Sequence, residues 1–249
     1  RRRDTITNTG VQSRERERTS HAERALQRKP GDGAHPAFAA LCSETEFVPQ
    51  RGALLATRRQ RSASDPLVWA AHLAVVEGES SGDLQFETDR ARFLGRGQTI
   101  RSPDAIADGW PLSNSTGAVL DPIFSLRRHV RSPRGATVRV AFWTLVASSR
   151  ETVLDLADKH QDSIAFERAK TLAWTQAQMQ LHHLGINPDE AHLFQRLAGH
   201  ILYSDPTLRP HAAMLKSSAG QASTLGAEGI SGDLPTVRVR IDGDDIFDR

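Results

Sequence analysis

The chain has 249 residues, which is enough for one large domain or two modest ones. Its 32 basic and 30 acidic residues give a formal net charge of +2, which gives little support to a nucleic-acid partner. Cys42 is the single cysteine, so no internal disulfide can form and a reducing compartment is expected. No apolar run approaches the roughly 18 residues needed to span a bilayer. Because the chain begins at Arg1 and ends at Arg249, just after a strand-like run, we expect a fragment of a longer protein.

Residues 1–34 form a basic segment with almost no apolar periodicity, including Arg-Glu-Arg-Glu-Arg at 14–18. This composition predicts a solvated, poorly ordered segment. A nucleic-acid-binding arm over residues 1–29 is the alternative. Acidic residues interleave with the arginines and no aromatic side chain is present to stack on bases, so no nucleic-acid partner is predicted.

Residues 35–148 carry β signals and predict a β-sandwich portion of several short strands joined by irregular loops. Residues 67–76 are apolar on both alternating faces, as in a strand buried on both sides, although a helix remains possible. Residues 138–146 alternate in the same way, with Val140 and Phe142 on one face and Ala141 and Trp143 on the other.

The period changes to helical near Ser148, and residues 149–216 are predicted to be a helical linker. Ser148 or Ser149 can cap a helix from Arg150, and Asp162 or Ser163 can cap the next. Residues 163–203 predict an antiparallel helical hairpin, because two apolar stripes are joined by a short turn.

The hairpin turn carries strong helix-boundary signals. Gly185 is placed to end the first helix, and Asn187 and Glu190 form a capping box with Pro188 at the first helical position. Residues 217–249 predict a Gly/Ser-rich linker and a strand at 236–241. The acidic residues at 242–245 lack the further ligands of a calcium loop and are expected to form a solvated turn, so no metal site is predicted.

Residues 89–97 read Asp-Arg-Ala-Arg-Phe-Leu-Gly-Arg-Gly and are the best candidate for ligand contact. Arginine donates several hydrogen bonds in a planar fork that suits phosphate or sugar hydroxyls. Arg92 and Arg96 are therefore the candidates for substrate contact, and Arg96 is the better one. A structural role of the motif is favoured over substrate contact, with Asp89 pairing with an arginine to hold the loop against the sandwich, and Asp89 and Arg90 are expected to brace the loop. Asp233, in the turn at 229–233, is a weaker substrate-binding candidate, since a structural role in that turn is favoured. No catalytic residue is predicted.

Several motifs together resemble a known family. They are residues 89–97, residues 121–128 (Asp-Pro-Ile-Phe-Ser-Leu-Arg-Arg), residues 156–160, residues 172–178 (Leu-Ala-Trp-Thr-Gln-Ala-Gln) and residues 229–241, in which Gly-Ile-Ser-Gly-Asp-Leu-Pro leads into Thr-Val-Arg-Val-Arg-Ile. The chain resembles bacterial cyclic β-1,2-glucan synthases in their glycoside-phosphorylase-like region, which belongs to the cellobiose/chitobiose phosphorylase family. The resemblance covers residues 35–241.

The resemblance implies a β-supersandwich, then a helical linker leading toward an (α/α) barrel that the chain does not include. It implies inverting chemistry, in which a carboxylic acid of the barrel protonates the glycosidic oxygen while inorganic phosphate attacks as co-substrate. No other cofactor is implied. The implied partners are β-glucan and the barrel, and the implied location is the cytoplasmic side of a bacterial inner-membrane protein.

The sequence leaves three functional hypotheses open. The favoured hypothesis is a non-catalytic portion of a glycosyltransferase or glycoside phosphorylase acting on β-glucans. The alternative is a free-standing β-sandwich carbohydrate-binding module with a helical tail. The third is a basic scaffold or nucleic-acid protein using residues 1–29, for which binding would fall steeply with salt.

Overall fold

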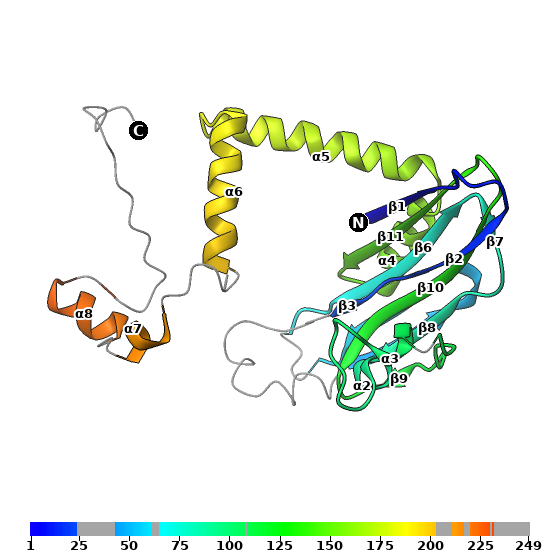
Figure 1. The fold of residues 1–249 in the computed structure, drawn as a ribbon, viewed down its shortest axis with the longest axis horizontal. Coiled ribbons are helices and arrows are strands. Elements are labelled where there is room, and N and C mark those ends of the chain that lie inside the picture. Colours follow the sequence, from blue (N-terminus) through cyan, green and yellow to red (C-terminus); the bar gives the residue numbers. More distant parts are fainter. Residues whose placement is uncertain are drawn as a thin grey trace. The chain divides into compact units, whose positions relative to one another are not determined.

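The computed structural model describes residues 1–23, 43–60, 65–107, 109–202, 211–216, 220–229 and 231. The chain divides into two compact units, Arg1–Ala173 and Trp174–Arg249. The first unit is a two-layer β-sandwich with helix α4 (Arg150–His160) packed on the outer face of one sheet (Figure 1).

The first sheet contains six described strands, and every pairing within it is antiparallel. In spatial order the strands are β1 (Arg2–Thr7), β11 (Thr137–Ala147), β6 (Trp69–Glu77), β5 (Ala53–Arg58), β4 (Ser43–Val48) and β9 (Gly117–Ala118). The 3-10 turn η2 (Pro49–Arg51) joins β4 to β5, and Gly52 completes it in the left-handed conformation at φ 55°.

The second sheet is organised around the long strand β10 (Pro122–Ser132). Along one edge β10 pairs with β2 (Arg14–Thr19) and β3 (Ala22–Glu23), and along the other with β7 (Glu79–Ser80) and β8 (Gln85–Asp89). All four pairings are antiparallel, so β10 is the one described strand on which the others of this sheet depend.

The central strands of the first sheet are buried on both faces. On β6, Ala70 and Ala74 lie in the core between the two sheets, whereas Ala71 and Leu73 lie in the core beneath the helices. Successive side chains of a strand point to opposite faces, so a strand with a core on each side needs apolar residues at every position. The strand predicted at residues 67–76 is therefore confirmed, and the helical alternative is wrong.

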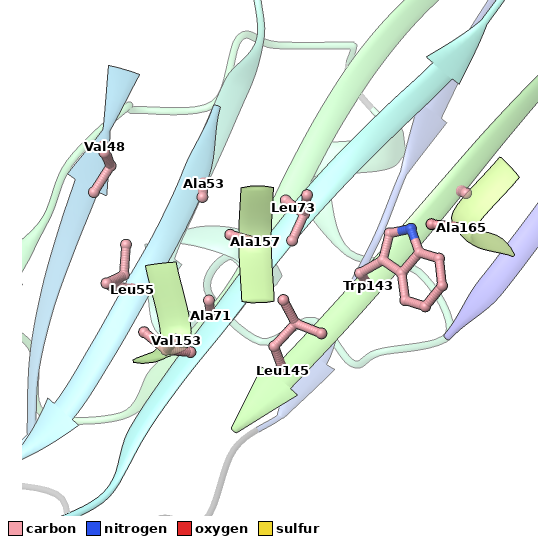
Figure 2. Close-up of a cluster of buried hydrophobic side chains, with 11 residues drawn as sticks. Val48, Ala53, Leu55, Ala71, Leu73, Trp143, Leu145, Val153, Ala157 and Ala165 are labelled. Atoms are coloured by element: carbon pink, nitrogen blue, oxygen red, sulfur yellow. The ribbon is translucent and has the colours of Figure 1, made fainter. Parts of the chain in front are cut away.

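The helix-side core is formed where α4 crosses β5, β6 and β11 (Figure 2). Val153 and Ala157 of α4 are completely buried above Leu55, Leu73 and Leu145. Burying a Val or Leu side chain contributes roughly 1.5–3 kcal/mol, so this contact accounts for much of the attachment of the helix. Trp143 extends the cluster toward Ala165 and packs edge-on against Phe166.

Local signals fix the ends of the helices as the sequence predicts. The Ser149 side chain accepts a hydrogen bond from the amide of Thr152 and caps α4. The Asp162 carboxylate accepts from the amide of Ile164 at the start of α5 (Ile164–His183). The remaining described helices are α2 (Arg90–Leu94), α3 (Asp104–Ala107), α6 (Pro188–Leu202), α7 (Ala212–Lys216) and α8 (Gln221–Ala227).

The N-terminal segment differs from its prediction. Residues 1–23 contribute β1 to the first sheet and β2 and β3 to the second, so the expectation of a poorly ordered segment over residues 1–34 is wrong for its described part. Edge strands need few apolar residues, because one long edge and often one face stay solvated. Charged strands such as residues 14–18 therefore lack the apolar alternation on which strand prediction relies.

The junction between α5 and α6 agrees with its prediction. Asn187 accepts a hydrogen bond from the Glu190 amide through its side chain, and the Glu190 carboxylate accepts from the Asn187 amide, which forms the capping box. Gly185 ends the first helix at φ 66°. Apolar side chains of both helices are exposed, including Leu172, Met179, Leu193 and Phe194. Antiparallel packing of the two helices therefore stays a prediction.

Part of the predicted linker is helical. Within residues 217–249, α8 forms where Ser223 and Thr224 donate hydroxyl hydrogen bonds to the carbonyl of Gly220. The strand predicted at 236–241 and the acidic turn at 242–245 lie outside the described residues. Among the helices that the structure describes, none is long and apolar enough to cross a membrane.

His72 lies between the two sheets, with 3% of its surface exposed. Its Nε2 is 2.9 Å from the Ser20 hydroxyl and its Nδ1 is 3.0 Å from the Thr144 hydroxyl. The ring stacks against Phe124 and Phe142. Burial penalises the charged form and lowers the pKa of His72 to about 4.

The folded protein should lose stability as the pH falls from 6.5 to about 4. Because the His72 pKa is about 4 in the folded protein and 6.5 ordinarily, the unfolded chain takes up the proton first. The lowered pKa of His72 therefore contributes to the free energy of unfolding. This contribution is fully present above pH 6.5, is lost by pH 4, and amounts to roughly 3 kcal/mol. Urea unfolding at pH 7 and pH 4.5 should show this loss, and His72→Gln should show a smaller pH dependence. An equal pH dependence in the variant would contradict this assignment.

Candidate functional site

The outer face of the second sheet is covered by the segment that runs from α2 to β9. Phe93 and Leu94 of α2, Ala105 of α3 and Leu112 form a small apolar cluster with Ile123 of β10. This cluster holds the segment on the sandwich by burial of apolar area. The segment is therefore a covering layer with its own core.

Arg127 of β10 fastens this layer to the sheet. Its side chain is 1% exposed, and its guanidinium donates to the Trp110 carbonyl at 2.6 Å and to the Ala105 carbonyl. Its Nε lies 2.9 Å from a Glu17 carboxylate oxygen and 3.1 Å from the Thr19 hydroxyl. A planar fork with five N–H groups can bind two carbonyls and a carboxylate at once, which a lysine ammonium cannot do in the same geometry.

Glu87 of β8 anchors the other end of the segment. Its carboxylate is 2% exposed and accepts hydrogen bonds from the amides of Thr88 and Asp89, both at 3.0 Å. Longer bonds of 3.4 Å come from the Ser113 amide and the Ser115 hydroxyl. A buried carboxylate with this many donors is held in one position, so Glu87 fixes the path of residues 113–115.

Between these anchors lies a hollow of about 280 Å³. The Trp110 side chain beside it is 69% exposed and the Arg92 side chain is 61% exposed. The hollow thus combines an exposed aromatic ring, a cation and two carboxylates. Its described lining residues are Glu87, Arg92, Asp104, Ala105, Trp110, Pro111, Leu112 and Ser113.

The Asp89–Gly97 motif builds one wall of the hollow. Asp89 caps α2 by accepting from the amides of Ala91 at 2.8 Å and Arg92 at 3.5 Å. Arg90 donates to Glu23 at 2.9 Å. These contacts agree with the bracing role predicted for Asp89 and Arg90, which stays a prediction. Gly95 has φ 85°, and a Cβ there would lie 1.7 Å from an Asp104 carboxylate oxygen. The glycine lets α2 pack directly against α3.

The match to a family model decides the family. Residues 2–163 match the model of the glycosyl hydrolase 94 supersandwich domain, which is more than half of the chain. The chain belongs to the glycosyl hydrolase 94 supersandwich family. The match begins at residue 2 and so includes the N-terminal strands, which the resemblance seen in the sequence did not reach.

One curated relative extends the similarity beyond the supersandwich. The cyclic β-(1,2)-glucan synthase NdvB of Rhizobium meliloti (strain 1021) is 39% identical over 243 residues. The matched region covers 98% of this chain and 9% of the relative. The chain therefore spans about a tenth of the length of this relative.

Of the two predicted site residues that the structure describes, Arg92 lines the hollow and Arg96 does not. Arg92 lines it, and its Nε lies 3.8 Å from the Asp89 carboxylate. Arg96 is exposed after the end of α2 and is not among the described residues that line the hollow. Asp233 lies outside the described residues.

Three further residues of this supersandwich site were missed in the sequence. Trp110 follows the glycine at 109 in a stretch read only as loop, and an exposed tryptophan beside Pro111 was the available signal. Arg127 lies in the motif at 121–128, where nothing marks it as buried. Glu87 follows Phe86 in a strand that alternates polar and apolar residues. This pattern is typical of a half-buried strand whose polar residues are solvated, so it does not indicate that Glu87 is buried. In the part of the chain that the structure describes, no group of three or more His, Cys, Asp or Glu side chains is placed to hold a metal.

Gly95→Ala should destabilise the supersandwich, because the new methyl group would collide with Asp104 and the backbone would keep a positive φ. We expect a loss on the order of 2–4 kcal/mol in the free energy of unfolding. Gly97→Ala is the matched control, since Gly97 has φ 75° but nothing within 4 Å of its added Cβ. Urea unfolding should show the larger loss at Gly95, and equal losses would contradict the close packing of α2 on α3.

Arg127→Lys should release the covering layer while keeping a positive charge. The lysine would leave at least one of the carbonyls of Ala105 and Trp110 without its donor, at an expected cost on the order of 2–3 kcal/mol. Amide hydrogen exchange should rise over residues 103–112 more than over β6. Unchanged exchange in that segment would show that the apolar cluster holds it without Arg127.

Proposed function

We propose that the chain is a non-catalytic, β-glucan-contacting portion of a bacterial enzyme of the cyclic β-1,2-glucan synthase type. The family membership and the similarity to a relative named cyclic β-(1,2)-glucan synthase support this proposal. In such an enzyme the sandwich precedes a helical barrel, which is the proposed partner of the helices after residue 149. The proposed location is the cytoplasmic side of the inner membrane.

The hollow beside α2 is the observation that carries the proposal. Sugar rings present apolar C–H faces and many hydroxyl groups. The Trp110 ring offers a broad apolar surface with a polar edge, Arg92 donates hydrogen bonds, and the Asp104 carboxylate accepts them. A concave site with a few polar groups beside an aromatic ring is the usual form of a ligand site.

The proposal gives the chain no catalytic residue. Inverting glycosidic chemistry needs a carboxylic acid that can protonate the leaving oxygen. Glu87 is buried and already accepts four hydrogen bonds, so it serves as a structural acceptor. We propose that the acid and the inorganic phosphate co-substrate belong to the barrel. The 249-residue chain should therefore bind β-1,2-glucan without converting it.

A free-standing carbohydrate-binding module is the second candidate. The described lining of the hollow belongs entirely to the unit Arg1–Ala173, so this unit needs no other domain to form the hollow. The mass of the protein in its native cell separates the two candidates. A species near 27.4 kDa would favour the module, and a much larger species would favour the enzyme portion.

Trp110→Ala should weaken binding of a β-1,2-glucan oligosaccharide to the 249-residue chain. Loss of the aromatic surface should lower affinity about tenfold, corresponding to about 1.4 kcal/mol. Trp174→Ala is the matched control, because Trp174 is 66% exposed on α5 and does not line the hollow. Isothermal titration measures both affinities, and equal affinity of the Trp110 variant and the wild type would refute the hollow as the sugar site.

Arg92 and Arg96 are proposed to contact the same substrate. Arg92→Ala should weaken oligosaccharide binding by on the order of 1–3 kcal/mol, the scale of a charge-assisted hydrogen bond, with little change in the folding midpoint. The same result for Arg96→Ala would extend the site past α2. If instead the midpoint falls and the affinity stays, the arginine is a brace. Asp233→Asn is tested in the same way.

A further inference from the structure

A second recess runs along the open side of the sandwich, between edge strands β1 and β2. Two hollows of about 610 and 150 Å³ are lined mainly by residues of these two strands and of the connection between them. The larger is lined by Arg2, Arg3, Asp4, Thr5, Glu17, Arg18, Thr19 and Ile106. The smaller is lined by Ile6, Thr7, Asn8, Thr9, Gly10, Arg14, Arg16 and Ser132. None of these described residues lines the hollow at Trp110.

Asn8 lines the smaller hollow and is buried. It is 5% exposed, and its side-chain amide donates to the carbonyls of Gln12 and Ser132, both at 2.8 Å. Its side-chain oxygen accepts from the Gly10 amide at 3.0 Å. These bonds fix the connection between β1 and β2 against the end of β10. The Asn8 side chain, which lines the smaller hollow, is therefore held by three hydrogen bonds.

Three arginines line the β2 side of the recess. Arg14, Arg16 and Arg18 occupy alternate positions of the strand, so they share one face and follow one another at about 6.6 Å. Like charges this close repel one another unless anions lie between them. The recess therefore concentrates positive charge in a chain whose formal net charge is only +2.

Within this row, Arg18 is the one arginine that forms an ion pair with a described carboxylate, that of Asp4. Asp4 binds Arg2, with Nε at 3.0 Å, and lies 4.0 Å from Arg18. Glu17 binds the buried Arg127 at 2.9 Å. Among the described residues that line the smaller hollow there is no carboxylate, and Arg14 and Arg16 make no ion pair with any described residue.

We infer that the smaller hollow binds a phosphate group, with Arg14 and Arg16 as its principal donors. Two guanidinium groups and the nearby Thr9 hydroxyl match the several acceptor oxygens of a phosphate, and a volume of about 150 Å³ accommodates one such group. Further phosphates of an extended ligand would lie along the larger hollow at Arg18. The inference does not depend on the proposed β-glucan site. Protection of an edge strand against pairing is the competing role for these charges.

The test compares the thermal midpoint of the 249-residue chain in sodium phosphate, sodium acetate and sodium chloride at equal ionic strength. A ligand that binds the folded state raises the midpoint. Phosphate should raise it and acetate should not. In Arg14→Gln/Arg16→Gln the phosphate effect should vanish, while Arg101→Gln, which removes an exposed arginine outside the recess, should respond like the wild type. Isothermal titration should show phosphate affinity falling at least fivefold in the double variant.

A second arm uses tripolyphosphate, which should bind more tightly than phosphate and should lose affinity in Arg18→Gln. Equal midpoint shifts with phosphate, acetate and chloride would overturn the inference, as would a phosphate shift that persists in the double variant. A phosphate effect lost equally in Arg101→Gln would show general charge screening and would also overturn it. If the double variant does not fold, Arg14→Gln alone gives the same comparison.

Discussion

Burial of the first sheet on both faces is the constraint on which the rest of this structure depends. One face of β5, β6 and β11 packs against the second sheet, and the other face packs against α4. Neither the second sheet nor α4 can therefore pack in place without these strands. Small residues such as Ala71 and Ala157 let the helix lie close to the strands. Both candidate binding sites lie away from these two cores, at the edge strands and at the outer segment.

Side chains of the second sheet fix the geometry of the hollow at Trp110. Arg127 projects from the central strand β10 and holds the backbone on which Trp110 and Ala105 lie, while Glu87 does the same for residues 113–115. These two buried charged side chains fix the backbone around the hollow. A loop fixed in this way can present exposed side chains with little loss of conformational entropy on binding.

Elements with apolar periodicity and helices with capping residues could be predicted from the sequence. The burial and exposure of individual charged and aromatic side chains could not. The doubly buried strand at 67–76 and the capping box at Asn187 rest on local patterns, and the structure contains both. The N-terminal strands were missed because charged edge strands carry no such pattern. Arg92 was identified from its motif. The burial of Arg127 was not predicted, because it depends on contacts with residues far from it in the chain, such as Thr19 and Trp110.

Hydrogen–deuterium exchange with a β-1,2-glucan oligosaccharide tests the central claim most directly, because it locates the ligand on the folded chain. The account predicts slower exchange over residues 90–95 and 109–115, which surround the hollow, with β6 and α4 unchanged. Protection confined to another part of the chain, or absent at saturating oligosaccharide, would contradict it.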